Sequence, residues 1–425
     1  MQPKKIFLIL FFIILIGAII CGLFVPIAMD VFAMGPHPFL PDEEATRATT
    51  DIMFGTGLVM VFSSAYFICS PLLGLYSDIH GRSKVFKIYF YCALFSYIFI
   101  LLGINIKSID IILFGTVLQS ISCGILPIIQ AATADIASGK KRVIYFGMIN
   151  AAMGFLILAA EFCNYLLRLD PTHTNHQVNI ILLMMTVLSA IGLMLTILFV
   201  PETKKKQIVL NPVINSAVIL RNLSKVFYKT ETRWLLFLLA LFQFSWGLYF
   251  QDIYVYLIKI ANMSSTNASL FISFTIIVFI VTLFFLFPLL IKYFATQKLL
   301  IFSFILCYIG MLGINWVNVS YISWLLIIPF AVGVAMINPI LWGQLSTSVN
   351  HTQYGFLMGI IGALWAFTWA LSDLVGDKLN DYYFSLPLVI ALVMMIACLQ
   401  IYLTLSRRLA NSTKRMLREN NNENT

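Results

Sequence analysis

Charged residues are scarce in this chain. Asp, Glu, Lys and Arg together make up 11% of its 425 residues, whereas 60% of the residues are hydrophobic. A soluble protein of this length would not need so much apolar surface, and the composition lies far outside the soluble globular range. The scarcity of charge therefore argues against a soluble enzyme or binding module. It predicts a polytopic membrane protein whose outer surface is solvated by lipid.

Catalytic and metal-binding motifs are also lacking. The sequence has no HExxH, GxSxG or GxxxxGK[ST] segment, so no enzyme is indicated and ATP-driven transport would need a separate subunit. The seven cysteines show no CxxC spacing and all lie in apolar stretches. That placement is typical of buried thiols rather than of a metal site or a disulfide framework. We therefore expect neither an enzyme nor a cofactor.

Long apolar runs are abundant instead. Each of the twelve runs is long enough to cross a bilayer as a helix of about 20 residues. A polar segment separates the sixth run from the seventh, so we expect an all-α integral membrane protein with twelve transmembrane helices in two six-helix halves. The halves are 1–200 and 234–406, with a cytoplasmic linker at 201–233 and a basic, disordered tail at 407–425. The runs lie at 6–28, 52–75, 86–106, 109–134, 143–167, 177–200, 234–258, 268–291, 299–317, 321–346, 355–376 and 385–406.

The position of the positive charge predicts the topology. With both termini on one side, 22 of the 27 Lys and Arg residues fall on that side. By the positive-inside rule both termini are cytoplasmic, so the net charge of +9 reflects topology and not a nucleic-acid partner. The N-terminal apolar run is too long for a signal peptide, and we interpret it as a retained first span. We expect a multi-pass protein of a bacterial inner membrane.

The loop between the second and third runs carries the most specific motif, GLYSDIHGRSKVF. Its spacing, Gly74-x-x-x-Asp78-x-x-Gly81-Arg82-x-Lys84, resembles the signature loop of the major facilitator superfamily. Glycines suit close approach of two helices. Asp78 can cap a helix N-terminus of the other half and Arg82 can pair with an acid, which together would form a latch that breaks when the halves rock. The alternative is that the loop serves topology alone.

Two further junctions resemble the same superfamily. ATADIASGKKRVIYFG (132–147) is similar to the junction of spans four and five in tetracycline-resistance-type proton antiporters. That resemblance implies that Asp135 joins Asp78 and Arg82 in a charge relay, and that Arg142 belongs to the same latch. NPILWGQLSTSVNHTQYGFLMGIIGAL (338–364) is similar to the family's junction of spans ten and eleven.

The chain also departs from the antiporters. Their helices five and eleven carry Gly-Pro pairs, but the matching places here are Ala160-Glu161 and Ser372-Asp373. The arginine usual in helix four is replaced by Thr116. These departures leave the antiporter branch open while the fold assignment stands.

Four carboxylates lie at similar depth. Glu161, Asp252 and Asp373 are each about 18 residues from the cytoplasmic end of their span, or roughly 27 Å, and Asp30 lies just beyond the first span. In the resembled fold, spans one and seven line the cavity and spans five and eleven meet the opposite half, so these acids could ring one pathway. Such acids suit proton coupling, gating or a cationic substrate. Alternatively, they are hydrated or paired acids at helix ends.

Polar and aromatic side chains are interleaved in several runs, most densely in the seventh. Such a mixture suits a pocket for an organic solute, although aromatic residues near helix ends can instead form an interfacial belt. The candidates for lining a cavity are Gln119, Gln130, Gln243, Trp246, Tyr249, Asn338, Gln344 and Trp365.

Together these features predict a secondary active transporter that moves a small organic solute, a drug or a metabolite, by alternating access and with proton coupling. Two alternatives stay open. One is an uncoupled facilitator or importer on the same fold, and the other is a transporter-derived membrane receptor that no longer transports. The expected partners are the solute, protons and the lipid bilayer, with no nucleic acid. The expected state is a monomer.

Overall fold

The computed structural model describes residues 2–27, 53–122, 124–169, 174–204, 216–316 and 321–423, and this part of the chain is helical with short connections. Eleven helical stretches within it are long and apolar enough to cross a membrane. Helix α3 (Met53–His80) covers the remaining predicted run, 52–75, from Met53 onward. The prediction of an all-helical membrane protein is therefore confirmed.

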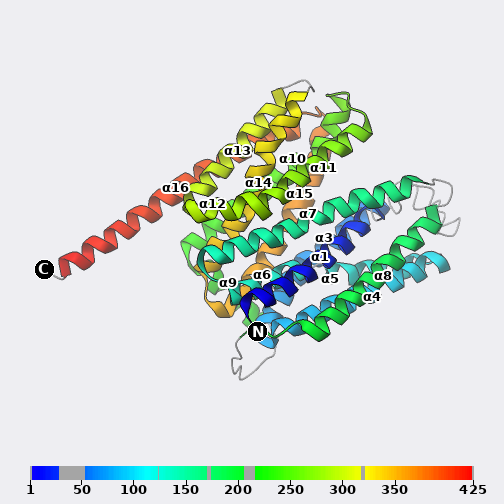
Figure 1. Ribbon diagram of the computed structural model, residues 1–425, viewed down its shortest axis with the longest axis horizontal. Coiled ribbons are helices and arrows are strands. Elements are labelled where there is room, and N and C mark those ends of the chain that lie inside the picture. Colours follow the sequence, from blue (N-terminus) through cyan, green and yellow to red (C-terminus); the bar gives the residue numbers. More distant parts are fainter. Residues whose placement is uncertain are drawn as a thin grey trace. The chain divides into compact units, whose positions relative to one another are not determined.

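The first compact unit, unit 1, comprises Met1–Val226 and Val349–Ala370. Helix α1 packs along α7 and α8, and α4 packs along α5 and α8 (Figure 1). Its helices are α1 (Pro3–Pro26), α3, α4 (Arg82–Ile106), α5 (Ile109–Ser122), α6 (Ile125–Ile136), α7 (Gly139–Leu169), α8 (Thr174–Phe199) and α9 (Ser216–Tyr228), with the last two residues of α9 in unit 2.

Close packing of α1 on α7 depends on a small residue. A side chain at Gly22 would collide with the Leu156 carbonyl and with Ala159 on α7, so only glycine allows this approach. One turn further along, the Cys163 thiol donates to the Leu23 carbonyl oxygen at 3.3 Å. Cys163 is fully buried in the core cluster of these helices, as expected for a structural thiol.

Helix α6 is enclosed on all sides. It contacts α1, α3, α4 and α7, and nearly every residue from Ile125 to Ala134 is buried. A helix that is apolar all round belongs in a core, and this one holds Asp135 next to its C-terminal end. Enclosure of α6 thus fixes the position of that carboxylate.

The second unit, unit 2, comprises Phe227–Ser348 and Leu371–Thr425. Helix α10 packs against α14 and α16, and α13 packs against the same two helices (Figure 1). Its elements are α10 (Thr230–Lys259), α11 (Ser265–Val281), a π-helical turn η3 (Thr282–Leu286), α12 (Phe287–Tyr293), α13 (Thr296–Trp316), α14 (Tyr321–Ser348) and α16 (Leu386–Glu423). The turn η3 leads directly into Pro288, whose missing N–H and ring disturb the preceding helical turn.

One helix belongs to both units. After the short 3-10 turn η4 (His351–Gln353), α15 (Tyr354–Asn380) begins in unit 1 and ends in unit 2. The sequence analysis places all of this helix in the second half, so the unit boundary differs from the predicted one. The physical reason is the close approach of the first turns of α15 to α3, described below.

The C-terminal tail also differs from the prediction. Residues 407–425 are predicted to be disordered, but α16 continues from the last membrane run to Glu423 (Figure 1). The helix of the span already supplies the costly nucleus, and Leu, Ala, Met, Lys and Arg in the tail are good helix formers.

Candidate functional site

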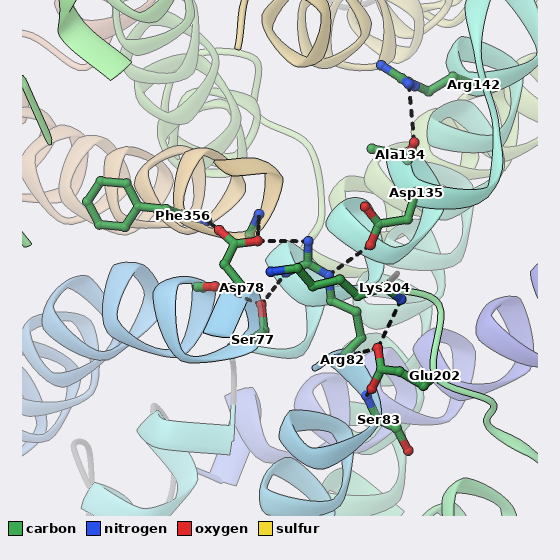
Figure 2. A network of polar contacts seen from close by, with 12 residues as sticks. Ser77, Asp78, Arg82, Ser83, Ala134, Asp135, Arg142, Glu202, Lys204 and Phe356 are labelled. Carbon is green, nitrogen blue, oxygen red and sulfur yellow. Dashed lines mark hydrogen bonds and ion pairs between the residues drawn. The ribbon is translucent and has the colours of Figure 1, made fainter. Parts of the chain in front are cut away.

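A buried arginine stands at the centre of a polar network in unit 1. Arg82 is the first residue of α4, and its side chain is fully buried. Its guanidinium lies 2.9 Å from an Asp78 oxygen and 3.0 Å from an Asp135 oxygen (Figure 2). A buried cation needs such paired anions to offset the loss of hydration. These three residues, called the charge network below, join the ends of α3, α4 and α6.

Asp78 also holds the start of α15. One carboxylate oxygen accepts a hydrogen bond from the Gly355 N–H at 3.0 Å, and the other accepts from the Phe356 N–H at 2.7 Å (Figure 2). Both amides belong to the first turn of a helix that begins at Tyr354, where N–H groups have no partner inside the helix. A carboxylate is favoured there by hydrogen bonding and by the helix dipole. Asp78 therefore caps α15 from a distant part of the chain.

Helices α3 and α15 approach so closely that side chains are excluded between them. A Cβ at Gly74 would collide with the Gly355 carbonyl, and a Cβ at Gly355 would collide with Gly74 and with the Arg82 guanidinium. One turn further along, the Ser70 hydroxyl donates to the Gly359 carbonyl oxygen at 2.9 Å. The glycines are thus required for Asp78 to reach the amides of α15.

Arg142, at the start of α7, closes the other side of the network. Its Nε donates to the Ala137 carbonyl oxygen at 2.8 Å. Its Nη2 donates to the Ala134 carbonyl oxygen at 3.2 Å (Figure 2). A cation suits the carbonyl end of α6, where the last C=O groups lack helical partners. The guanidinium also lies over the Tyr354 ring, 5.1 Å from its centre.

Glu202, which follows the end of α8, belongs to this site although it is not among the residues predicted from the sequence. Its carboxylate accepts hydrogen bonds from the Arg82 N–H at 2.9 Å and from the Ser83 N–H at 3.2 Å, and so caps the start of α4 (Figure 2). Gly81 has a φ of 101°, and a Cβ there would collide with this carboxylate. The signal in the sequence is an acid in Pro201-Glu202-Thr203, at the end of a span and on the positively charged side.

Lys204 contributes a further positive charge beside the network. Burial lowers the pKa of its ammonium, while Asp78, Asp135 and Glu202 act to raise it. By contrast, Lys84 is exposed and takes no part in the ion pairs that the structure describes around Arg82. Its place in the signature loop is therefore not matched by a place in the charge network.

We predict that Glu202→Ala loosens the start of α4 without unfolding the protein. The Arg82 and Ser83 amides would lose their acceptor, at a cost of about 1 kcal/mol. Hydrogen exchange of peptides spanning 81–84 should then be about fivefold faster. Glu231→Ala removes an equally exposed acid from the first turn of α10 and should leave these amides unchanged. Equal exchange in both variants would show that Glu202 does not cap α4.

A second polar cluster lies in unit 2. Asp252 on α10 is only 5% exposed. Its Oδ1 accepts a hydrogen bond from the Asn380 Nδ2 at 2.6 Å, whereas its Oδ2 has no hydrogen-bond partner in the described part of the chain. Asp373 and Asp377 on α15 lie close enough to repel its charge. A Cβ at Gly376 would collide with the Oδ2 atom, so glycine is needed for α15 to lie against this buried carboxylate.

The register of α15 explains this cluster. Asp373, Asp377 and Asn380 are spaced i, i+4, i+7 and share one helix face. The Ser372 hydroxyl donates to the Gln251 amide oxygen at 2.8 Å, which fixes α15 against α10. The sequence contains this spacing, but the depth of an acid along its span does not reveal it.

Two of the four predicted acids lie together within one unit. Asp252 and Asp373 are neighbours in unit 2. Glu161 lies on α7 in unit 1 and is partly exposed. Asp30 lies outside the described residues. The cluster in unit 2 therefore contains two of the predicted acids, Asp252 and Asp373. Asp377 and Asn380 belong to the same cluster.

The cavity-lining candidates of unit 2 have defined surroundings. The Gln243 Nε2 donates to the Asn338 Oδ1 at 2.7 Å, which satisfies both amides in part. Trp246 and Tyr249 are buried on α10. Gln344 donates to a tyrosine hydroxyl of α16 at 3.0 Å, so its amide bridges α14 and α16.

The candidates of unit 1 divide into partnered and unpartnered groups. The Gln119 Oε1 accepts from the Ser122 hydroxyl at 3.0 Å. Gln130 is 1% exposed, and neither of its amide atoms has a hydrogen-bond partner among the described residues. Trp365 packs edge-on against Tyr66, with ring centres 5.9 Å apart.

Comparison with solved structures shows the same fold. A crystal structure of the human organic anion transporter MFSD10 (TETRAN) has a TM-score of 0.78 at 17% identity, covering 95% of this chain and 100% of that one. The proton:xylose symporter XylE gives 0.70 at 16% identity, covering 95% of each chain. FucP in its outward conformation gives 0.69 at 14% identity, covering 94% of this chain and 97% of that one.

Comparison of sequences adds the family. No individual curated protein matches this chain in sequence. The family model described as Major Facilitator Superfamily matches residues 6–372. Because that match covers most of a chain that already shows the fold of these transporters, the chain belongs to the Major Facilitator Superfamily of multi-pass membrane transporters.

Proposed function

We propose that this protein moves a small organic solute across a bacterial inner membrane by alternating access, driven by the proton gradient, with both termini in the cytoplasm. Asp252, together with Asp373, is the coupling site, and Glu161 and Asp30 contribute to gating. The charge network is the latch that opens and closes once in each cycle. Of the known transporters, the solved proton:xylose symporter supplies a precedent for proton coupling on this fold.

The observation that carries this proposal is the environment of Asp252. Its carboxylate lies in a membrane run, is almost fully buried, and keeps one oxygen without a hydrogen-bond partner among the described residues. An ionisable residue inside a membrane is costly and is characteristic of proton relays and substrate pathways. Asp373 and Asp377 on α15 add charge of the same sign beside Asp252.

The charge network supports the alternating part of the proposal. Asp78 holds the first turn of α15 and Arg82 joins it to Asp135, so release of α15 from α3 requires these bonds to break. A protein that keeps one conformation would not need such a device. This argues against the alternative of a receptor that no longer transports.

Within the family, the three junction motifs support the tetracycline-resistance-type antiporter branch. The competing candidate is an uncoupled facilitator or importer, favoured by the replacement of the antiporter Gly-Pro pairs by Ala160-Glu161 and Ser372-Asp373. The two candidates differ in one measurable property, namely whether solute flux moves protons.

The test uses purified protein in liposomes with an imposed pH gradient, to which a library of cationic and neutral metabolites and sugars is added. We expect solute-dependent proton flux in the wild type and a loss of more than tenfold in Asp252→Asn. Asn keeps an acceptor for Asn380, so folding should be preserved. Asp381→Asn changes an exposed acid just beyond α15 and serves as the control. Solute flux that ignores both the gradient and Asp252→Asn would make the protein a facilitator.

A further inference from the structure

The first turns of α1 and α7 are held together at one end of unit 1. The rings of Phe7 on α1 and Tyr145 on α7 are stacked with centres 3.7 Å apart. Deeper along the same two helices, Gly22 lies against Leu156 and Ala159. Residue numbers rise together along both helices, so α1 and α7 run parallel and begin on the same side of the membrane.

Three exposed lysines occupy this shared end. Lys4 lies one turn before Phe7 on α1, and Lys5 follows it. Lys141 lies one turn before Tyr145 on α7, with its ammonium 5.6 Å from the centre of that ring. Positive charge in a first turn is unfavourable, because the N-terminal end of the helix dipole is itself positive. Neither helix has an acid in its first turn, so neither balances this charge itself.

The acids of unit 1 that lie at this end are engaged elsewhere. They are Asp78, Asp135 and Glu202, and the sequence has no other acid in the N-terminal segment, in the connections on this side or in α9. Asp78 and Asp135 pair with Arg82, and Glu202 caps α4. Neither of the ion pairs among the described residues includes the three lysines. An anion from outside the unit would therefore balance a charge that the unit leaves unbalanced.

Beyond the lysines, α1 has an exposed apolar face. Lys4, Leu8 and Phe12 are spaced i, i+4, i+8 and so share one side of the helix. Leu8 is 54% exposed and Phe12 is 50% exposed, and both lie in a membrane run where the surrounding solvent is lipid. Lysine above an apolar helix face matches a molecule with a charged head at the interface and a chain in the bilayer. The apolar face therefore favours a lipid over a soluble anion.

We propose that Lys4, Lys5 and Lys141, called the lysine cluster below, bind the headgroup of an anionic phospholipid whose acyl chain lies along the apolar face of α1. Lysines next to the membrane end of a helix attract anionic lipids. The stack of Phe7 on Tyr145 keeps the two helix starts together, so one phosphate can meet ammonium groups from both. This surface is separate from the charge network and from the acids of unit 2.

Native mass spectrometry of the purified full chain in detergent micelles tests this proposal. The protein is titrated with anionic dioleoylphosphatidylglycerol and, separately, with zwitterionic dioleoylphosphatidylcholine, and the affinity for the first bound lipid is measured. We expect the anionic lipid to bind on the order of tenfold more tightly, because each lysine adds to the attraction. The triple variant Lys4→Gln, Lys5→Gln and Lys141→Gln should lose this preference and bind the two lipids equally.

A charge-matched variant separates the lysine cluster from net charge. Lys84→Gln, Arg221→Gln and Lys225→Gln together remove three positive charges from exposed positions elsewhere in unit 1. This control should keep the preference for the anionic lipid. Equal affinity for the two lipids in the wild type would overturn the proposal. Equal losses in the two triple variants would also overturn it, since binding would then follow net charge alone.

Two further measurements test the chemistry of the site. Lys4→Arg, Lys5→Arg and Lys141→Arg together keep the charge and should keep the preference, whereas a loss as large as that of the Gln variant would contradict a headgroup site. Inorganic phosphate in large excess supplies the anion without an acyl chain and should not displace the bound lipid. Displacement would assign the lysine cluster to a soluble anion and overturn the proposal.

Discussion

Substitution Arg82→Leu should be the most damaging single change in unit 1. The variant would leave Asp78 and Asp135 buried without the cation that lies 2.9 and 3.0 Å from them. Removal of one partner from a buried ion pair costs about 3–5 kcal/mol, because the remaining charge stays desolvated. We expect a large fall in the thermal unfolding temperature of the purified protein and loss of transport, with the first turn of α15 released from α3.

The matched control is Lys84→Leu, two residues along the same helix. Lys84 carries the same charge but is exposed, so its removal should change stability by less than about 0.5 kcal/mol. Equal unfolding temperatures for the two variants would show that the charge network does not stabilise the protein. The double variant Asp78→Asn with Arg82→Leu should recover part of the loss, since it removes one of the two stranded charges.

Substitution Gly355→Ala should have the second largest effect. The added methyl group would meet the Arg82 guanidinium, the Gly74 carbonyl and the Ser77 hydroxyl, so α15 can no longer lie against α3. Overpacking of this kind costs about 1–3 kcal/mol. Because the Gly355 and Phe356 amides would then lose Asp78, we expect faster hydrogen exchange in peptides spanning 354–357 and at least tenfold slower transport.

The control for this steric effect is Leu374→Ala, which changes an exposed residue on the same helix. Its exchange at 354–357 should equal that of the wild type. If Gly355→Ala also leaves this exchange unchanged, a methyl group fits between α15 and α3. Close packing of these helices would then not be required for the proposed latch.

The fold was largely predictable from the sequence, because apolar runs of fixed length and the placement of Lys and Arg reflect the bilayer directly. The motif around Asp78 and Arg82 was also informative, since glycines and an acid at that spacing serve a close helix contact. Glu202 was missed because an acid in a basic linker looks like a solvated charge. Only the structure shows that it caps α4, more than a hundred residues earlier in the chain.

The second cluster was predicted only in part. Depth along the spans placed Asp252 and Asp373 at the same level, but depth does not say which faces meet. Helices that are apolar nearly all round carry little information about rotation, so contact between α10 and the end of α15 could not be derived. The roles of Asn380 and Gly376 follow from that contact, so they could not be predicted from the sequence either.

Helix α15 is continuous from Tyr354 to Asn380 and contains no proline, so nothing in its sequence is expected to kink it. At its first turn it carries the amides that Asp78 holds, and at its last turn it carries the amide that holds Asp252. The two turns are separated by roughly 36 Å, at a rise of 1.5 Å per residue. A helix of this length behaves as a stiff rod, so any axial slip or tilt imposed at one end is delivered to the other.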